Sequence, residues 1–565
     1  MNYLDFIVLG ATLVLIVLVG VWQIKKQHNI QSFLLGDKSM KWGTIGLSVM
    51  ATQASAITFI STPGQAYESG LSFVQNYFGL PFALIIVSAV FIPIYYKLRV
   101  YTAYEYLESR FDIKTRMLGA FLFLVQRGLA AGITIYAPAI ILSSILGWNL
   151  NATIFLTGLS VIIYTVTGGT KAVSVTQKYQ MMIIMVGMFA AFFIAIGYIT
   201  RNVSMGDAMD IAGSLGKLNA VDLDFNFEKR YTIWSGLAGG LFLALSYFGT
   251  DQSQVSRYLT GKNVTASRMG LMFNAVFKVP MQFAILFTGV LVYIFYVFYL
   301  PPVHFKETSM EMLRNSPAKE ELAIIEEKYD GLVERRKEIA LNIPSTAKGS
   351  EERARLLDEF KTVDGESIQV RNQVKDLITS VSPDTETKDS DYVFLTFVLN
   401  YLPNGLIGLL IAVILSAAMS STSSELNALA STSAIDFYKR LINDKASDRQ
   451  YLMVSRILTL FWGGVALSFA VIATNTENLL EAINIIGSIF YGTILGIFIV
   501  AFLIKYVKGT AVFYGALVAQ AVVFLVHYLV LAEHLTLGYL WYNVIGFSTT
   551  ILVSMAIQFM QPKKG

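Results

Sequence analysis

Apolar stretches long enough to cross a bilayer recur along most of this chain of 565 residues. A helix needs about 20 consecutive apolar residues to span the hydrocarbon core, and a helix satisfies its own backbone hydrogen bonds at that depth. The residues are 55% hydrophobic, with a mean hydropathy of +0.57. We therefore expect an all-α integral membrane protein with about 13 transmembrane helices, near residues 5–24, 44–66, 73–96, 115–147, 151–167, 178–200, 232–250, 270–299, 393–425, 451–474, 479–504, 510–532 and 536–560.

Basic residues mark alternate loops between these stretches. Lys25 follows the first stretch and Lys97 follows the third, whereas the loops 147–151 and 474–481 carry no lysine or arginine. The positive-inside rule then places the N-terminus outside and the C-terminus in the cytoplasm of a plasma (inner) membrane. No basic residue precedes the first stretch and no small-residue cleavage site follows it, so we expect a retained helix rather than a signal peptide.

A long polar segment at 301–392 interrupts the apolar pattern on the outer side. Leu322, Ile325 and Tyr329 recur within it at helical spacing, with charged residues on the other faces. We expect three parts: residues 1–300 with helices 1–8, an extracellular charged helical insertion at 301–392, and residues 393–565 with helices 9–13. Gating and partner contact are functional interpretations of the insertion, and a solvated surface addition is the simpler one.

Six hydroxyl residues and one carboxylate crowd about three helical turns at membrane depth. They follow the apolar run 406–415 and comprise Ser416, Ser420, Ser421, Thr422, Ser423, Ser424 and Glu425. Small hydroxyl residues let helices approach closely, which explains one or two of them. Hydroxyls at i, i+1, i+3 and i+4 line one side of a helix, and small hard cations prefer oxygen ligands. The pattern predicts an ion site in an ion-coupled transporter.

The second apolar stretch also carries a polar centre, between Met50 and Gly64. We expect Pro63 and Gly64 to break its outer half. An unwound helix frees backbone carbonyls for a cation, as in discontinuous transporter helices. A proline kink in an ordinary helix is the alternative.

Two charged residues lie deep in apolar runs and need partners. Lys278 could face a substrate carboxylate, pair with Asp251 or extend to the inner surface. Glu425 could pair with Lys178 or Lys171.

The chain has no cysteine and four histidines, which excludes disulfides and thiolate metal sites. No residue cluster suits hydrolysis or redox chemistry, so we expect neither an enzyme nor a nucleic-acid partner.

Several motifs together resemble the sodium:solute symporter family across nearly the whole chain except 301–392. They are PGQAYESG at 63–70, TAYEYLESRF at 102–111, YAPA at 136–139, the glycine pair 168–169, QSQVSRY at 252–258 and the serine-rich helix ending in IDFY at 435–438. The second and third look nearest to the iodide, monocarboxylate and multivitamin branch. Residues 51–62 also resemble bacterial sialic acid transporters.

The resemblance implies a LeuT-type core of two inverted five-helix repeats with flanking helices. It implies that sodium is the coupling ion, held between the broken helix and the serine-rich helix. Its ligands, carried over by position, are the carbonyls of Ala51, Ala54 and Ala417 and the hydroxyls of Ser420 and Ser421. Tyr247 falls where sugar transporters of the family keep a gate beneath the substrate, although an aromatic there also suits an interfacial belt. Lys278 falls where those transporters have a lysine.

Two departures from the family pattern bear on the cargo. Members with a second sodium site carry Trp-Thr-Asp where this chain has Val175, Thr176 and Gln177, which disfavours a second sodium at Ser423 and Ser424. Ala130 stands where the sialic acid branch has its carboxylate-binding arginine, although Arg127 is one turn away.

We therefore expect a sodium-coupled secondary active symporter that imports a small organic anion by alternating access across the lipid bilayer. The expected substrate pocket consists of Gln53, Ser55, Thr58, Gln75, Tyr77, Tyr247 and Asn484, with Lys278, Ser423, Ser424 and Glu425 as further candidates. The alternatives are a sodium-coupled sugar or sialic acid symporter and a transporter-like sensor or channel. The absence of a recognisable signalling domain after residue 560 disfavours the sensor.

Overall fold

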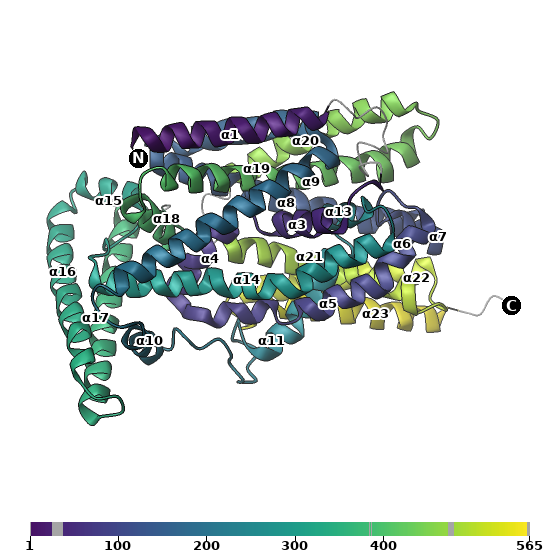
Figure 1. The fold of residues 1–565 in the computed structure, drawn as a ribbon. Coiled ribbons are helices and arrows are strands. Elements are labelled where there is room, and N and C mark those ends of the chain that lie inside the picture. Colours follow the sequence, from purple (N-terminus) through teal and green to yellow (C-terminus); the bar gives the residue numbers. More distant parts are fainter. Residues whose placement is uncertain (1, 25–37, 384, 386, 473–478, 562–565) are drawn as a thin grey trace.

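A computed structural model describes residues 2–24, 38–383, 385, 387–472 and 479–561. Helices lie side by side in one bundle, with the start of α1 at one end of it and the end of α23 at the other (Figure 1). The described helices are α1 (Tyr3–Ile24), α3 (Trp42–Gln53), α4 (Ala56–Ser69), η2 (Gly70–Tyr77), α5 (Leu80–Ile86), η3 (Val87–Phe91), α6 (Ile92–Leu98), α7 (Glu105–Arg110), α8 (Ile113–Leu146), α9 (Leu150–Ile199), α10 (Met205–Ser214), α11 (Ile233–Leu237), α12 (Gly239–Gly249), α13 (Gln252–Leu259), α14 (Val264–Phe298), α15 (Glu307–Arg314), α16 (Lys319–Asn342), η4 (Ile343–Ser345), α17 (Glu351–Val381), α18 (Ser390–Tyr401), α19 (Leu406–Thr432), η5 (Ser433–Ile442), α20 (Asp448–Ile472), α21 (Leu479–Leu503), α22 (Gly509–Leu531) and α23 (Trp541–Met560).

The expected all-helical membrane architecture is confirmed. Nine helical segments of the described part of the chain are long and apolar enough to cross a membrane, and α11–α12 with α13 form a tenth candidate bent by 56°. α9 covers two of the expected spans and has 50 residues, which at 1.5 Å per residue is about 75 Å and far exceeds the hydrocarbon core. The count of 13 spans stays a prediction.

The serine-rich helix begins later than the sequence indicated. The expected span 393–425 is divided into α18 and α19, because the chain turns at Gly405, which has a φ of 86°. The buried carboxylate of Asp5 accepts hydrogen bonds there from the backbone N–H groups of Gly405 at 2.5 Å and Gly408 at 3.2 Å. A carboxylate at this position satisfies free N–H groups and complements the positive end of the helix. α1 thus fixes the start of α19.

The second expected span is broken, but not at the proline. The backbone leaves helical geometry at Ala54 and Ser55, between α3 and α4. Pro63 lies inside α4, so the expected break at Pro63 and Gly64 is wrong. Glycines instead allow this part of α4 to pack closely against α18 and α14. A Cβ on Gly64 would lie 1.9 Å from the Ser390 carbonyl oxygen, and one on Gly289 would lie 2.1 Å from that of Pro63.

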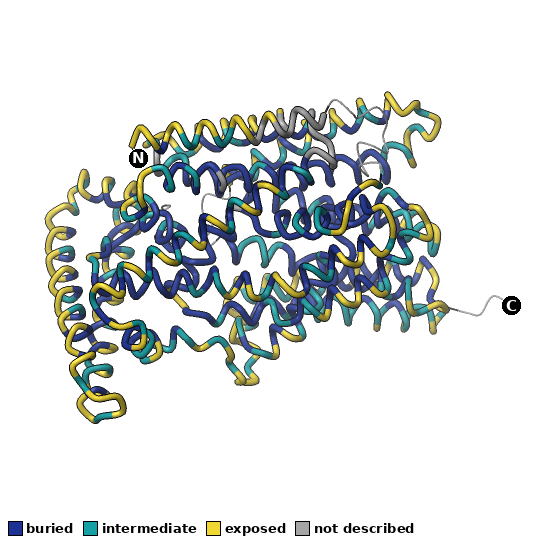
Figure 2. Tube along the Cα trace, in the orientation of Figure 1, coloured by how far each residue is buried: buried dark blue, intermediate teal, exposed yellow. Residues whose placement is uncertain are grey.

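Residues 307–381 form a charged helical layer across the end of the bundle where the N-terminus lies (Figure 1). α16 and α17 pack against each other as a hairpin, with their apolar residues inside and many exposed residues outside (Figure 2). Buried arginines attach this hairpin to its surroundings. Arg353 reaches Asp207 of α10 at 2.6 Å, and Arg336 donates to the Tyr296 carbonyl oxygen of α14 at 2.9 Å.

The same end of the bundle holds the end of α4. The amine of Lys217 donates to the carbonyl oxygens of Tyr67 at 2.7 Å and Glu68 at 3.2 Å. Burial lowers the pKa of Lys217 to about 8, although the carboxylates of Asp364 and Glu68 favour its charged form. Its amine also lies 4.0 Å from the ring centre of Tyr293. Lys217 therefore anchors the end of α4, which is the half of the broken helix that follows Ala54 and Ser55.

Candidate ion and substrate site

The break between α3 and α4 faces the serine-rich helix α19. The hydroxyl of Ser421 points at the Ala51 carbonyl oxygen, 3.4 Å away. The hydroxyl of Ser420 is buried and has no hydrogen-bond partner among the described residues. The five expected sodium ligands, Ala51, Ala54, Ala417, Ser420 and Ser421, are all at most 5% exposed. Neutral oxygens, one of them unpartnered, suit a small hard cation, so these residues fit sodium.

Gln177 occupies the neighbouring position expected for a second ion. Its side-chain oxygen accepts a hydrogen bond from Ser48 at 2.7 Å, and its amide nitrogen donates to Thr52 and Ser424, each at 3.1 Å. Ser424 in turn donates to the Ser420 carbonyl oxygen at 2.9 Å. The amide of Gln177 thus connects α9 to both α3 and α19. The hydroxyl of Ser424 accepts one hydrogen bond and donates another within the protein.

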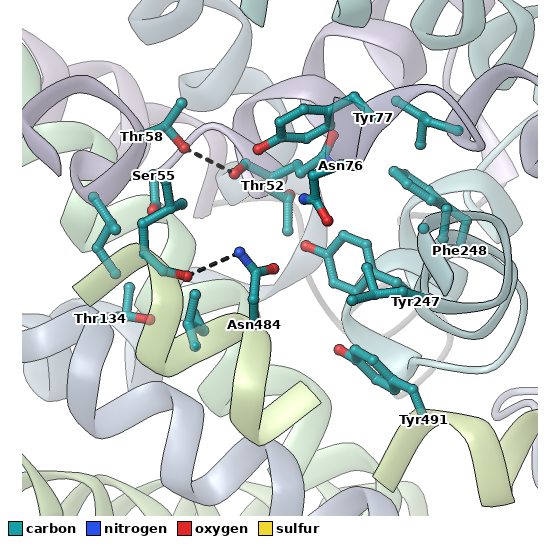
Figure 3. Close-up of a pocket in the computed structure, with 18 of the residues that line it drawn as sticks. Thr52, Ser55, Thr58, Asn76, Tyr77, Thr134, Tyr247, Phe248, Asn484 and Tyr491 are labelled. Atoms are coloured by element: carbon teal, nitrogen blue, oxygen red, sulfur yellow. Dashed lines mark hydrogen bonds between the residues drawn. The ribbon is translucent and has the colours of Figure 1, made fainter. Parts of the chain in front are cut away.

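A cavity of about 100 Å³ lies between the broken helices α3–α4 and α12–α13 (Figure 3). Its lining comprises Thr52, Gln53, Ser55, Ile57, Thr58, Asn76, Tyr77, Leu80, Gln126, Arg127, Thr134, Gly240, Leu243, Ala244, Tyr247, Phe248, Glu425, Leu480, Ile483, Asn484 and Tyr491. The expected pocket residues Gln53, Ser55, Thr58, Tyr77, Tyr247 and Asn484 are among them. Gln75 is not, because its side chain accepts from Asp222 N–H at 2.8 Å and donates to the Tyr231 carbonyl at 3.1 Å.

A buried ion cluster forms part of the cavity wall. Arg127 of α8 donates to Glu425 of α19 at 3.0 Å, to the Tyr491 hydroxyl of α21 at 2.5 Å and to Asp251, at the bend between α12 and α13. Tyr491 also donates to Asp251, at 2.8 Å. The expected pairing of Glu425 with Lys178 is wrong, because Lys178 instead lies against the ring of Tyr179. The side chain of Lys171 lies outside the described residues.

Arg127 was missing from the expected site, although it was noted one turn from Ala130. The signal that could have identified it is a charge within an apolar run, the same signal that singled out Lys278.

Lys278 does not pair with Asp251 and does not extend to the surface. It is 1% exposed, and its amine has no hydrogen-bond partner among the described residues. The amine lies 5.8 Å from the ring centre of Tyr77, a distance at which a cation interacts with an aromatic face. Tyr77 lines the cavity, whereas Lys278 is not among the lining residues.

Tyr247 belongs to the cavity wall, and its interpretation as an interfacial belt residue is wrong. Its hydroxyl accepts a hydrogen bond from Gln254 of α13 at 2.5 Å, and its ring lies 5.4 Å from the guanidinium carbon of Arg127. Figure 3 shows the rings of Tyr247 and Tyr491 next to each other on the same side of the cavity. Tyr247, Tyr491 and Arg127 thus form one wall of the cavity.

The sequence matches a known family over most of its length. The model of the sodium:solute symporter family covers residues 33–315 and 377–519, which leaves out most of the charged hairpin. Sodium-coupled monocarboxylate transporter 1 of Xenopus laevis is 27% identical over 527 residues, 92% of this chain and 71% of that protein. Sodium-coupled monocarboxylate transporter 2 of Mus musculus is 30% identical over 292 residues, 51% of this chain and 47% of that protein, so this match spans about half of each.

The fold matches that of a solved transporter. A Na+-coupled sialic acid symporter superimposes with a TM-score of 0.74 and 21% sequence identity, over 99% of this chain and 98% of that chain. This likeness confirms the expected LeuT-type architecture. A rabbit (Oryctolagus cuniculus) sodium-dependent multivitamin transporter is also similar, with 26% identity over 88% of this chain and 66% of that protein. The resemblance that the motifs indicated is confirmed: this chain belongs to the sodium:solute symporter family.

Proposed function

We propose that this sodium-coupled symporter imports a small organic anion. The observation that carries the proposal is the cavity of about 100 Å³ between two broken helices, next to the sodium ligand set. A buried water needs roughly 10–15 Å³ of such volume, so the cavity has room for a small solute. A sialic acid is much larger. Relatives whose names refer to monocarboxylates support an acid of the smaller size.

The cavity also offers a cationic donor for an anion. The Nε–H group of Arg127 is buried and has no hydrogen-bond partner among the described residues, although the guanidinium lines the cavity. An arginine N–H group pairs strongly with a carboxylate. The sodium ion would add positive charge at the break of the adjacent helix, which favours joint binding of cation and anion.

Sodium binding would join the break between α3 and α4 to α19. The carbonyls of Ala51 and Ala54 belong to the broken segment, and the hydroxyls of Ser420 and Ser421 belong to α19, which Asp5 anchors. An ion shared between them would order the break before the solute binds beside it. Release then follows when the helices rearrange around the central site.

We assign the end of the bundle with the N-terminus and the hairpin α16–α17 to the outside of a plasma (inner) membrane, and the C-terminus to the cytoplasm. The positive-inside rule supports this orientation. The start of α1 and the hairpin lie at the same end of the bundle, and the end of α23 lies at the opposite end (Figure 1).

Uptake into proteoliposomes tests the substrate class. An inward sodium gradient is expected to drive accumulation of labelled monocarboxylates of three to nine carbons, and dissipating the gradient should abolish it. Labelled sugars and sialic acid serve as the comparison and should not accumulate. Accumulation of a sugar or of sialic acid, without uptake of any of the acids, would overturn the proposal in favour of the sugar or sialic acid alternative.

We further predict a stoichiometry of one sodium ion per solute. Gln177 lacks the negative charge that would offset the desolvation of a second cation, and its hydrogen bonds to Ser48, Thr52 and Ser424 are already formed. Reversal potentials measured in proteoliposomes at graded sodium gradients should give a coupling ratio of one. A ratio of two would contradict this prediction, and Gln177→Asp would then be expected to change the ratio little.

A further inference from the structure

One oxygen of Glu425 is buried at the cavity wall without a partner. Its Oε1 accepts the hydrogen bond from Arg127 at 3.0 Å, and its Oε2 has no hydrogen-bond partner among the described residues. The residue is 5% exposed and lines the cavity. The hydroxyl of Thr134 lies beside it, but that hydroxyl donates to the Ala130 carbonyl oxygen at 3.0 Å. A buried carboxylate oxygen left in this way is costly.

The charges around Glu425 do not supply a partner. Arg127 is shared between two carboxylates, and Asp251 receives more of the available donors: Arg127, the Tyr491 hydroxyl at 2.8 Å, and the backbone N–H and hydroxyl of Ser253 at 2.8 and 2.6 Å. Asp251 is therefore satisfied within the protein. The unused accepting capacity of the cluster is concentrated on Oε2 of Glu425, a residue that lines the cavity.

Other cavity groups are adaptable, whereas Glu425 is not. Gln53, Asn76 and Gln126 each have a buried side-chain oxygen without a partner, but an amide can present either its oxygen or its nitrogen to a ligand. An ionised carboxylate only accepts hydrogen bonds. Glu425 thus offers a fixed hydrogen-bond acceptor to a solute that carries a donor at this position.

We propose that Glu425 Oε2 accepts a hydrogen bond from the transported solute, so that the symporter selects small acids with a hydroxyl or ammonium group next to the carboxylate. The proposal rests on the proposed import of an organic anion. Arg127 Nε–H takes the carboxylate, and Glu425 takes the neighbouring donor. Arg127 Nη1 and Glu425 Oε1 are hydrogen-bonded at 3.0 Å, so Arg127 Nε and Glu425 Oε2 belong to one small cluster. A single small solute can therefore reach both, and 2-hydroxy and 2-amino acids are the smallest acids that carry both groups.

Matched sets of acids test this selectivity with the unmodified protein. Proteoliposomes are given an inward sodium gradient, and the uptake of labelled sodium that each acid stimulates is measured. One set of acids is propionate, lactate and alanine, and the other is butyrate, 2-hydroxybutyrate and 2-aminobutyrate. In at least one set, a donor-bearing acid should half-saturate at a concentration about tenfold or more below its donor-free analogue, as expected when a buried charged acceptor is left unpaired. The hydroxy and amino arms show which donor is preferred.

A variant separates the role of Glu425 from a general effect of shape. Glu425→Gln keeps the size of the side chain and should reduce the preference for donor-bearing acids to within about threefold. Glu108→Gln is the matched control, because Glu108 also pairs with an arginine, Arg116 at 2.7 Å, but lies outside the cavity lining. It should leave the ranking of the acids unchanged.

The outcomes distinguish this inference from the proposed function. If donor-free acids drive sodium uptake as well as their hydroxy and amino analogues, the inference is overturned while import of organic anions stands. If Glu425→Gln folds and keeps the full preference, the assignment to Glu425 is overturned. If none of the acids drives sodium uptake, both this inference and the proposed function are overturned.

Discussion

Replacing Arg127 with methionine is expected to reduce solute-driven sodium uptake more than a hundredfold and to destabilise the protein. The substitution leaves Asp251 and Glu425 buried and without their shared cation. Removing one partner of a buried ion pair costs about 3–5 kcal/mol, because the remaining charge is uncompensated. The same change removes the donor that we assign to the substrate carboxylate. Uptake in proteoliposomes and thermal unfolding of the purified protein measure the two effects.

Two further variants separate the loss of stability from the loss of transport. Arg440→Met removes an exposed arginine that pairs with Glu108 at 2.6 Å. Exposed ion pairs contribute little to stability, so both measurements should stay near the unmodified values. The combination Arg127→Met, Asp251→Asn and Glu425→Gln removes all three charges. It should recover thermal stability without recovering uptake. Normal uptake by a folded Arg127→Met protein would contradict the assigned role.

The helices were predictable because they leave a local signal, and the serine-rich segment that we assign to sodium leaves one as well. Apolar runs of spanning length leave the chain no other stable state in a bilayer, and this governs most of the architecture. Hydroxyls crowded at membrane depth, as from Ser420 to Ser424, are costly unless they serve a purpose. The position of a helix break is harder to predict from the sequence. Pro63 attracted the prediction, but a proline is tolerated inside α4, and the break lies at Ala54 and Ser55.

The ion cluster could not be predicted because its members are far apart in the sequence. Arg127 lies 124 residues from Asp251 and 298 from Glu425, and each charge alone only indicates that a partner exists. Assigning Glu425 to Lys178 matched two charges that packing keeps apart. Gln75 shows the converse difficulty. It lies near cavity residues along the chain, yet its amide is used by the backbone of Asp222 and Tyr231.

Ser421→Ala is expected to raise the sodium concentration that half-saturates uptake by about tenfold or more while leaving the protein folded. The hydroxyl is one of the oxygens assigned to the ion, and a polar contact to a charged group contributes about 1.5–3 kcal/mol. Its hydrogen bond to the Ala51 carbonyl oxygen is long, at 3.4 Å, so little stability is lost with it. Alanine also has a higher helix propensity than serine. Sodium titration of solute uptake measures the shift.

Ser416→Ala is the matched control on the same helix. Ser416 is 1% exposed, and its hydroxyl donates to the Ala412 carbonyl oxygen of the preceding turn at 2.6 Å. That hydroxyl is bound within α19 and is not among the assigned ligands. Its removal should leave the sodium dependence unchanged. The assigned site would be contradicted if the half-saturating sodium concentration stayed unchanged in Ser421→Ala, or if it shifted equally in both variants. The sodium dependence would then not rest on an oxygen at the break between α3 and α4.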